Sequence, residues 1–311
     1  MNALPSRRSR RTGILHGYIR YRHFFFMLLP VLVYFFIFHY GPMWGMLIAF
    51  KDFYPLRGFF GSPWVGFKHF GDLFSGLYFF PVLRNTLIIS FLKLIFGFPA
   101  PIILAVMLNE VRHMYFKRTI QTISYLPHFI SWVVLAGLVI EILSPSRGPV
   151  NWLLQVLGIK PVFFVASKPW FRPVLVLSSI WREIGWQSII FLAAISNIDP
   201  ELYDVADIDG AGRLRKIFSI TIPAIFPVIV ILFIFATGRI INDDFEQILN
   251  LLNPLVMEVG DVIMTYTFRE GIQKLNYSYA SAVGFFKNGV SLLLVLTANS
   301  IARRMTGHSV W

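Results

Sequence analysis

The sequence predicts an all-α, polytopic membrane protein with six transmembrane helices. Three observations lead to this fold class: the composition, a series of long apolar runs and the distribution of the basic residues. Of the 311 residues, 56% are hydrophobic and 17% are aromatic, whereas only 14% are charged. So few charged side chains cannot cover the surface of soluble domains of this length.

The net charge of +12 comes from 28 Lys and Arg against 16 Asp and Glu. A basic chain of this kind can bind nucleic acid, but the enrichment of basic residues in cytoplasmic loops gives a membrane protein the same excess. Nucleic acid is therefore not an expected partner. The chain has no cysteine, which excludes disulfides, thiolate nucleophiles and Cys-ligated metal centres.

Six runs are long enough to cross a hydrocarbon core of about 30 Å as helices. The predicted spans are residues 23–40, 86–108, 120–143, 174–196, 218–241 and 282–302. The first is short because His39-Tyr40-Gly41-Pro42 interrupts it, and residues 43–50 either continue this span or lie along the interface. It is not expected to be a cleaved signal peptide, since no small-residue cleavage site follows it.

The basic residues predict the orientation of these spans. With the N-terminus inside, segments 1–22, 109–118, 197–217 and 303–311 hold 14 Lys and Arg in 62 residues, and the outer segments hold 10 in 104. Both termini are therefore expected to be cytoplasmic. The predicted organisation is a basic N-terminal tail (1–22) that contacts anionic lipid, a membrane domain (23–304) and a short C-terminal tail (305–311).

The loop between the fourth and fifth predicted spans is expected to form a helix, a turn and a second helix. Asp199 is a good N-cap, and Pro200 suits the first helical position. An apolar helix face and two glycines expected at positive φ follow, formed by Leu202, Val205 and Ala206, then Gly210 and Gly212. A protruding helix pair with no chemistry of its own indicates a docking element, although a helix lying on the membrane surface is an alternative.

This loop resembles the E-A-A-x3-G-x9-I-x-L-P signature of the membrane subunits of binding-protein-dependent ABC importers. The spacing is the same throughout, and the matching positions are Asp204, Val205, Ala206, Gly210, Ile220 and Pro223. Asp204 replaces Glu and has a shorter reach, Val205 replaces the first Ala, and Ile222 replaces Leu. Asp-Pro-Glu-Leu-Tyr before the motif and Asp-Gly-Ala-Gly within it are similar to the carbohydrate-importing branch.

The resemblance extends over about residues 23 to 304. Phe50-Lys51-Asp52-Phe53, Trp64-Val65-Gly66-Phe67 and the segments 245–255 and 277–284 are similar to permeases of complex oligosaccharides. The family implies a six-span permease in a bacterial cytoplasmic membrane, with a coupling helix in the loop 197–223. It also implies a heterodimer with a second permease subunit, two cytoplasmic ATPase subunits and an extracytoplasmic solute-binding protein that delivers an oligosaccharide.

The chain itself is expected to be a transport subunit and not an enzyme. The sequence lacks a Gly-x4-Gly-Lys-Ser/Thr loop, so ATP and Mg are expected on the ATPase subunits and no cofactor on this chain. His-Glu-x-x-His and Gly-x-Ser-x-Gly motifs are also absent from the sequence. A permease for amino acids or peptides and an intramembrane enzyme stay open as alternatives.

Polar residues at membrane depth are the candidates for the substrate path, because such residues are costly in hydrocarbon and line cavities or helix interfaces. In the fourth predicted span Trp181, Glu183 and Trp186, beside Arg182, are expected near one side of the helix. Aromatic faces with adjacent polar groups suit the ring faces and hydroxyls of a sugar. The alternative is an interfacial aromatic belt in which Arg182 and Glu183 compensate each other.

A second polar group follows the fifth predicted span. Its members are Arg239, Asn242, Asp243 and Gln247, with Asp244 and Glu246 beside them. They are expected either to contact the sugar or to grip the external binding protein through a salt-bridged cluster.

The basic residues at membrane depth also bear on the substrate. Arg182 and Arg239, together with Lys93 and Lys287, suggest that the path accepts uronate-bearing oligosaccharides, because buried cations pair with carboxylates. The two lysines alternatively reach towards an interface. Tyr125, Pro127, His128 and Trp132 in the third predicted span are interpreted as a proline-bent packing segment and not as a site.

Overall fold

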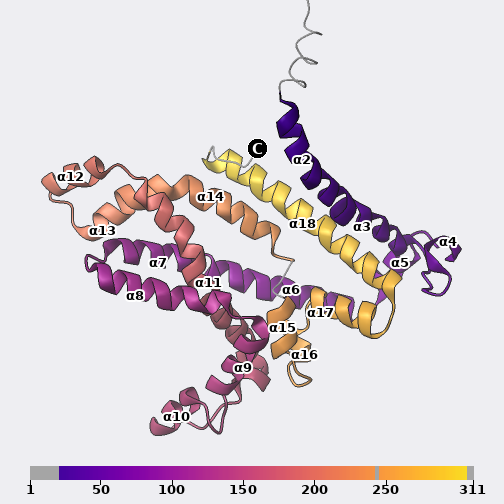
Figure 1. Ribbon diagram of the computed structural model, residues 1–311. Coiled ribbons are helices and arrows are strands. Elements are labelled where there is room, and N and C mark those ends of the chain that lie inside the picture. Colours follow the sequence, from indigo (N-terminus) through magenta and orange to yellow (C-terminus); the bar gives the residue numbers. More distant parts are fainter. Residues whose placement is uncertain (1–20, 242–244, 307–311) are drawn as a thin grey trace, which may run out of the picture. The chain divides into compact units, whose positions relative to one another are not determined.

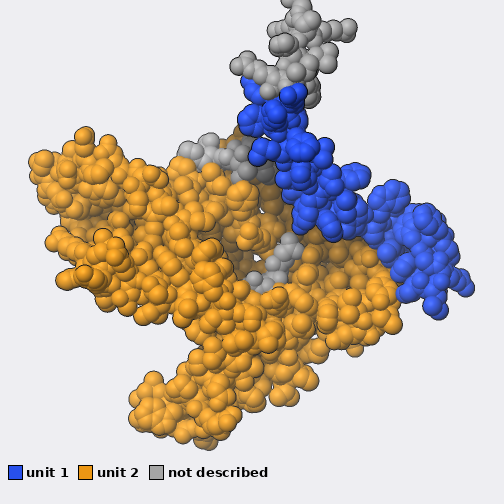
Figure 2. Space-filling view, in the orientation of Figure 1, with its two compact units in different colours: residues 1–67 blue, residues 68–311 orange. Residues whose placement is uncertain are grey.

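The computed structural model describes residues 21–241 and 245–306, and the regular secondary structure of these ranges is helical, as the sequence predicts. The exception is one isolated antiparallel bridge between Lys51 and Trp64. The chain divides into two compact units, residues 1–67 and residues 68–311 (Figure 2).

The described part of the first unit begins with a helix that runs continuously over Arg22–Phe50. It consists of α2 (Arg22–Phe35), a π-helical turn (Phe36–Tyr40), α3 (Gly41–Met43) and a 3-10 segment (Trp44–Phe50). Residues 43–50 thus continue the first span. Pro42 does not interrupt it, because the proline lies in the first turn of α3 directly after the wider π-helical turn.

Two sequence segments of the first unit lie against each other after this helix. Backbone hydrogen bonds join 50–53 to 63–66 around the Lys51–Trp64 bridge, beside the short helix α4 (Gly58–Gly61). The side chain of Lys51 is only 2% exposed, and its Nζ lies 4.4 Å from the ring centre of Phe59 and 5.0 Å from that of Trp64. The cation thus lies against two aromatic rings, one on α4 and one in the segment 63–66.

The second unit is built from long helices joined by short ones (Figure 1). The long helices are α6 (Phe79–Leu92), α7 (Pro99–Glu110), α8 (Met114–Tyr125), α9 (Trp132–Ile142), α11 (Lys168–Ser196), α14 (Ile222–Gly238) and α18 (Tyr277–Thr306). A π-helical turn, Lys93–Gly97, links α6 to α7. The short helices are α5 (Lys68–Ser75), α10 (Pro149–Val156), α12 (Pro200–Ile208), α13 (Arg213–Lys216), α15 (Phe245–Leu251), α16 (Met257–Gly260) and α17 (Ile263–Phe268).

Within the described ranges, four continuous helices are long and apolar enough to cross a membrane. They are Arg22–Phe50, Phe79–Glu110, Arg213–Gly238 and Tyr277–Arg304. A bent helix pair, Met114–Phe129 with Trp132–Ile142, is a fifth candidate if it forms one span. The prediction of a polytopic helical membrane protein is therefore confirmed with four or five candidate spans. α11 is 29 residues long, but it carries Arg172, Arg182 and Glu183 and is not among these candidate helices.

The predicted third span, 120–143, is not one straight helix. The helices on either side of residues 130–131 meet at 111°, after a 3-10 turn over Leu126–Phe129 in which Pro127 is buried. Pro127 cannot donate a backbone hydrogen bond, and its ring clashes with a continuing α-helix, so α8 ends before it. The proline bend expected in this segment is thus present, and it is much sharper than an ordinary kink.

Helix α11 lies at the centre of the second unit, where it packs along α7 and against α8. Gly185 allows it to approach α8 closely, because a Cβ atom there would lie 2.1 Å from the carbonyl oxygen of Ser124. Buried Phe171 and Leu175 near the start of α11 pack in one apolar cluster, and Phe191 and Ile195 near its end pack in another. This packing fixes the part of α11 between the clusters, which carries Arg182, Glu183 and Trp186.

Candidate functional site

Helix α12 forms a projection beyond the end of α11 (Figure 1). It begins where the sequence predicts: Asp199 is the N-cap, its side chain accepts a hydrogen bond from the N–H of Glu201 at 3.0 Å, and Pro200 occupies the first turn. Glu201 also places a negative charge at the positive end of the helix dipole. Local sequence alone therefore explains why this short helix forms.

The turn after α12 depends on one glycine and not on two. Gly210 has φ +72°, and the N–H of Ala211 donates to the carbonyl of Ala206 at 2.8 Å, which satisfies the helix end. Gly212 has φ −67° and ψ 165° as the N-cap of α13. The prediction of a positive φ at Gly212 is therefore wrong, because the reversal is complete before this residue.

The apolar side of α12 is exposed. Leu202 is 50% exposed, Val205 58% and Ile208 86%. Asp204 is exposed as well, whereas Ala206 is half-buried. A short capped helix that holds apolar side chains out in this way has the geometry of a docking element.

Two side-chain contacts join this projection to the helix that follows. The hydroxyl of Tyr203 on α12 lies 2.9 Å from Oγ1 of Thr221, which is buried at the end of the π-helical turn Ile217–Thr221. Nζ of Lys216 lies 2.8 Å from a carboxylate oxygen of Asp207. The other motif residues, half-buried Ile220 and exposed Pro223, lie at the junction of this turn with α14. A displacement of α12 would therefore act directly on the start of α14.

The second candidate site lies midway along α11, opposite the bend between α8 and α9. Nδ1 of His128 lies 3.2 Å from one carboxylate oxygen of Glu183, and an Nη atom of Arg182 lies 3.2 Å from the other. The His128 and Trp186 rings are stacked, with centres 4.6 Å apart and an interplanar angle of 3°. The Arg182 guanidinium lies 4.9 Å from the ring centre of Trp132, which is almost fully buried.

The bend at Pro127 thus brings His128 and Trp132 to the polar residues of α11. The interpretation of these two residues as packing only is incomplete, because His128 contacts both Glu183 and Trp186. His128 and Glu183 are 55 residues apart along the chain, so no short sequence motif links them. The signal that was available is the proline beside a histidine in an apolar run, which combines a bend with a polar side chain at membrane depth.

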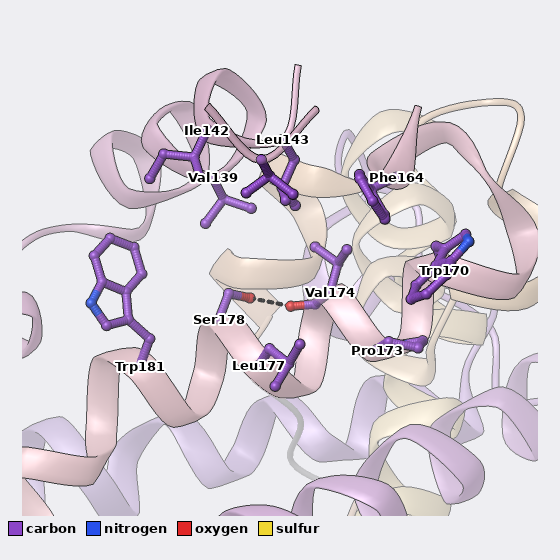
Figure 3. Close-up of a pocket in the computed structure, with 11 residues that line it drawn as sticks. Val139, Ile142, Leu143, Phe164, Trp170, Pro173, Val174, Leu177, Ser178 and Trp181 are labelled. Carbon is purple, nitrogen blue, oxygen red and sulfur yellow. Dashed lines mark hydrogen bonds between the residues drawn. The ribbon is translucent and has the colours of Figure 1, made fainter. Parts of the chain in front are cut away.

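Trp181 does not join this cluster. It lines an open apolar pocket of about 450 Å³, and Figure 3 shows its indole directed into that space, opposite Val139 and Ile142 of α9. Ser178, which also lines the pocket, donates its hydroxyl to the carbonyl of Val174 at 2.6 Å. The prediction that Trp181 shares one side of the helix with Glu183 and Trp186 is therefore wrong, since 100° per residue turns it towards α9.

The second predicted polar group is only partly described. Asn242 and Asp243, with Asp244, lie outside the described residues. Arg239 and Glu246 are exposed. Gln247 has 0% exposure: its amide donates to the carbonyl of Leu175 at 2.7 Å and to Oγ of Ser178 at 2.8 Å, so it joins α15 to α11.

The two lysines of the uronate hypothesis occupy different surroundings. Nζ of Lys93, in the turn between α6 and α7, donates to Oε1 of Gln247 at 2.8 Å. Nζ of half-buried Lys287, on α18, lies 3.2 Å from the sulfur of Met264. Among the described residues no carboxylate pairs with Lys287.

Outside the predicted spans, a polar junction attaches α16 to α6 and α11. Buried Asn85 donates to the carbonyl oxygens of Glu258 and Asp261, at 2.8 and 3.2 Å, and accepts a hydrogen bond from Arg172 at 2.9 Å. Lys168 pairs with Glu258, and this contact lowers the pKa of that carboxyl below its ordinary value. The segment after α15 is therefore fixed to the start of α11.

The chain matches the family described as "binding-protein-dependent transport system inner membrane component" over residues 97–307. Because this match covers more than half of the chain, the protein belongs to that family. The class that the fold and the family define is the membrane permease subunit of a binding-protein-dependent ABC importer, which is not itself an ATPase.

Individual relatives resemble nearly the whole chain. The polygalacturonan/rhamnogalacturonan transport system permease protein YteP of Bacillus subtilis (strain 168) is 42% identical over 311 residues, which cover 100% of this chain and 97% of the relative. Protein LplB of the same organism is 46% identical over 280 residues, or 90% of this chain and 88% of the relative.

The fold is also similar to that of a solved transporter. A chain in the crystal structure of a bacterial alginate ABC transporter, in complex with an alginate pentasaccharide-bound periplasmic protein, has a TM-score of 0.87 and 44% sequence identity. The similarity covers 95% of this chain and 99% of that chain. A second crystal structure, of a transporter involved in the import of the acidic polysaccharide alginate, has the same TM-score and identity.

Proposed function

We propose that this permease forms half of the import path for oligosaccharides that carry carboxylates, such as oligogalacturonides or alginate fragments. The observation that carries this proposal is the agreement of two relatives over almost the full chain. One is named for polygalacturonan and rhamnogalacturonan, and the other belongs to an importer of the acidic polysaccharide alginate. Both polymers contain uronic acids.

The cations at membrane depth support an acidic substrate. Lys287 and Arg182 lie on two different long helices, α18 and α11. A charged side chain inside a bilayer is costly unless it faces water, a partner or a substrate. For Lys287 the described partner is a sulfur atom and not a carboxylate, which leaves its charge available to a uronate.

The proposed architecture has six spans with both termini in the cytoplasm. It counts the bent pair α8–α9 as one span and α11 as another, in addition to the four apolar helices. α11 then crosses the membrane with Arg182 and Glu183 paired to each other and shielded by His128 and Trp132. Residues 1–22 and 305–311 are the cytoplasmic tails of the membrane domain 23–304.

In the proposed assembly a second, different permease completes the path, and a solute-binding protein delivers the sugar from outside. Two ATPase subunits hold ATP and Mg in the cytoplasm, and one of them receives α12. In the loop 197–223, Asp204, Val205 and Ala206 form the docking surface, and Gly210 fixes its turn. Ile220 and Pro223 connect that surface to α14.

The substrate path has two proposed parts. The central contact consists of Arg182, Glu183 and Trp186. His128, at the bend between α8 and α9, holds Glu183 and Trp186 in place. Arg239, Asn242 and Asp243 form the outer contact, where sugar passes from the binding protein. Gln247 does not contact the sugar but positions Lys93 through a hydrogen bond. Trp181 lines the neighbouring apolar pocket.

Uptake by the complete importer in proteoliposomes tests the proposal. The matched substrates are trigalacturonate and its methyl ester, which has nearly the same shape but no charge. We expect ATP-dependent uptake of the acid to exceed that of the ester. Arg182→Ala and Arg239→Ala should reduce acid uptake at least several-fold, whereas Arg147→Ala, at an exposed arginine before α10, should not. Equal uptake of acid and ester, or indifference to both Arg182→Ala and Arg239→Ala, would contradict the proposal.

A further inference from the structure

We infer that Glu183 is an internal counter-ion, which holds Arg182 while the path is empty and yields it to the carboxylate of an arriving sugar. In this arrangement His128 retains Glu183 after the exchange. The inference rests on the proposed function, because it requires a substrate that carries carboxylates.

The contact between Arg182 and Glu183 is weak enough to be replaced. The two residues are neighbours in one helix, where consecutive side chains point in directions about 100° apart. They meet through a single contact of 3.2 Å, and the side chains remain 20% and 24% exposed. Arginine binds a carboxylate best through two parallel hydrogen bonds, which this geometry does not provide.

Arg182 also has unused donors. Its Nε is buried and has no hydrogen-bond partner among the described residues. Its Nη2 has only a long contact, 3.5 Å, with the carbonyl oxygen of His128. Trp132 lies against one face of the guanidinium, so a carboxylate would meet these donors along the edge of the guanidinium once Arg182 turns away from Glu183. A uronate that binds this edge gains contacts that Glu183 does not make.

His128 explains how Glu183 tolerates the exchange. An ionised carboxylate only accepts hydrogen bonds, so Nδ1 of His128 must donate to Glu183 across their 3.2 Å contact. The parallel stack with Trp186 fixes the plane of the imidazole. When Arg182 turns to the substrate, one carboxylate oxygen of Glu183 therefore keeps a partner, and no unpaired anion is left inside the protein.

This exchange would select acidic over neutral sugars. A sugar hydroxyl can donate to Glu183 or accept from Arg182, but it cannot replace the negative charge beside the guanidinium. Separating the pair for a neutral ligand leaves two charges with weaker partners. A neutral sugar therefore leaves the pair closed and gains nothing from Arg182, whereas a uronate gains the guanidinium as a partner.

Equilibrium binding to the purified importer, without the binding protein, tests the inference. Isothermal titration calorimetry with trigalacturonate and its methyl ester would compare wild type, Glu183→Gln, His128→Phe, the double variant and the control Gln187→Ala. Gln187 is exposed on the same helix. Phenylalanine keeps a ring for the Trp186 stack but removes the donor to Glu183.

We expect Glu183→Gln to bind the acid about tenfold more tightly, because Arg182 loses its internal partner, and to bind the ester as wild type does. His128→Phe should weaken acid binding by about tenfold, since displaced Glu183 has no second partner. The double variant should resemble Glu183→Gln, because His128 acts only through Glu183.

Additive effects in the double variant would overturn the inference. An equal effect of Glu183→Gln on acid and ester would overturn it too, since both results indicate a merely structural role. If His128→Phe fails to assemble, as judged by co-purification, the nearly isosteric Glu183→Gln still decides the matter. Wild-type import of trigalacturonate with no gain in Glu183→Gln would refute the counter-ion alone, whereas no import of any oligouronide would refute the proposed function as well.

Discussion

The hydroxyl of Tyr203 lies 2.9 Å from Oγ1 of Thr221, and this contact joins the projecting helix α12 to the base of α14. Thr221 is only 1% exposed, so the contact is anchored in the packed part of the unit. Through it, a force applied to α12 would reach α14 without first bending the loop between them.

Tyr203→Phe removes this hydrogen bond and keeps the ring. A neutral hydrogen bond contributes about 0.5–1.5 kcal/mol, so α12 should become looser without unfolding. We expect fewer sugars imported for each ATP hydrolysed, by a factor of about two to ten. Sugar uptake and phosphate release measured on the same proteoliposomes would give this ratio. Tyr115→Phe, at an exposed tyrosine of α8, is the control, and an equal loss in the control would contradict the prediction.

Gly210→Val should uncouple ATP hydrolysis from uptake. The φ of +72° at Gly210 strains a β-branched residue, and the turn would have to rebuild. Gly212→Ala, two residues later at an ordinary φ, should leave uptake within twofold of wild type. Both variants should reach the membrane in normal amounts. Unchanged uptake by Gly210→Val would show that this turn does not need its observed conformation.

Asp204→Lys reverses the charge on the exposed side of α12 without touching the turn. If this surface meets an ATPase subunit, the substitution should reduce co-purification of the ATPase and abolish most uptake. Asp209→Lys, at the exposed C-cap of the same helix, is the control and should have a smaller effect. Similar losses in the two variants would indicate a general charge effect and not a specific contact.

Gly185→Ala should destabilise the protein, because its methyl group would meet the backbone of Ser124. Overpacking of this kind costs about 1–3 kcal/mol, and moving α11 away from α8 would also separate Glu183 from His128. Thermal unfolding of the purified complex measures the loss. Gly137→Ala on α9 has open space around the added methyl and should be neutral. Equal unfolding midpoints for the two variants would contradict this account of the helix crossing.

Gln247→Leu tests whether this buried amide is structural. The substitution removes the hydrogen bonds that join the Gln247 side chain to Nζ of Lys93, Oγ of Ser178 and the carbonyl of Leu175. Each such hydrogen bond contributes about 0.5–1.5 kcal/mol, so the unfolding midpoint should fall. The ratio of acid to ester uptake should stay the same in the protein that remains folded, and a changed ratio would place Gln247 in contact with substrate.

Local and periodic features of the chain could be predicted from the sequence. The apolar runs give the long helices because a spanning helix must satisfy its backbone internally, and Asp199-Pro200 gives the start of α12 because the cap is local. The ends of the helices extend beyond the apolar runs, since polar residues also continue a helix once it has started. The first helix also continues through Gly41-Pro42, because the π-helical turn before them accommodates the proline.

Contacts between distant segments could not be predicted in the same way. Pro127 predicts a bend, but only the packing of α8 against α11 at Gly185 determines that the bend brings His128 to Glu183. The direction of Trp181 depends on the helix α9 beside it, and the sequence does not specify that neighbour. The buried position of Gln247 likewise follows from how α15 folds back on α11.

Site-specific crosslinking tests most directly the central claim that α12 is the attachment point of a separate ATPase. The chain has no native cysteine, so Val205→Cys and, as a control on the distant α10, Gln155→Cys each provide a single reactive position. In the complete importer we predict that Val205→Cys crosslinks to an ATPase subunit and that added ATP changes the yield, while Gln155→Cys gives no such product. Absence of any crosslink from Val205→Cys in an assembled, ATP-hydrolysing complex would contradict the account.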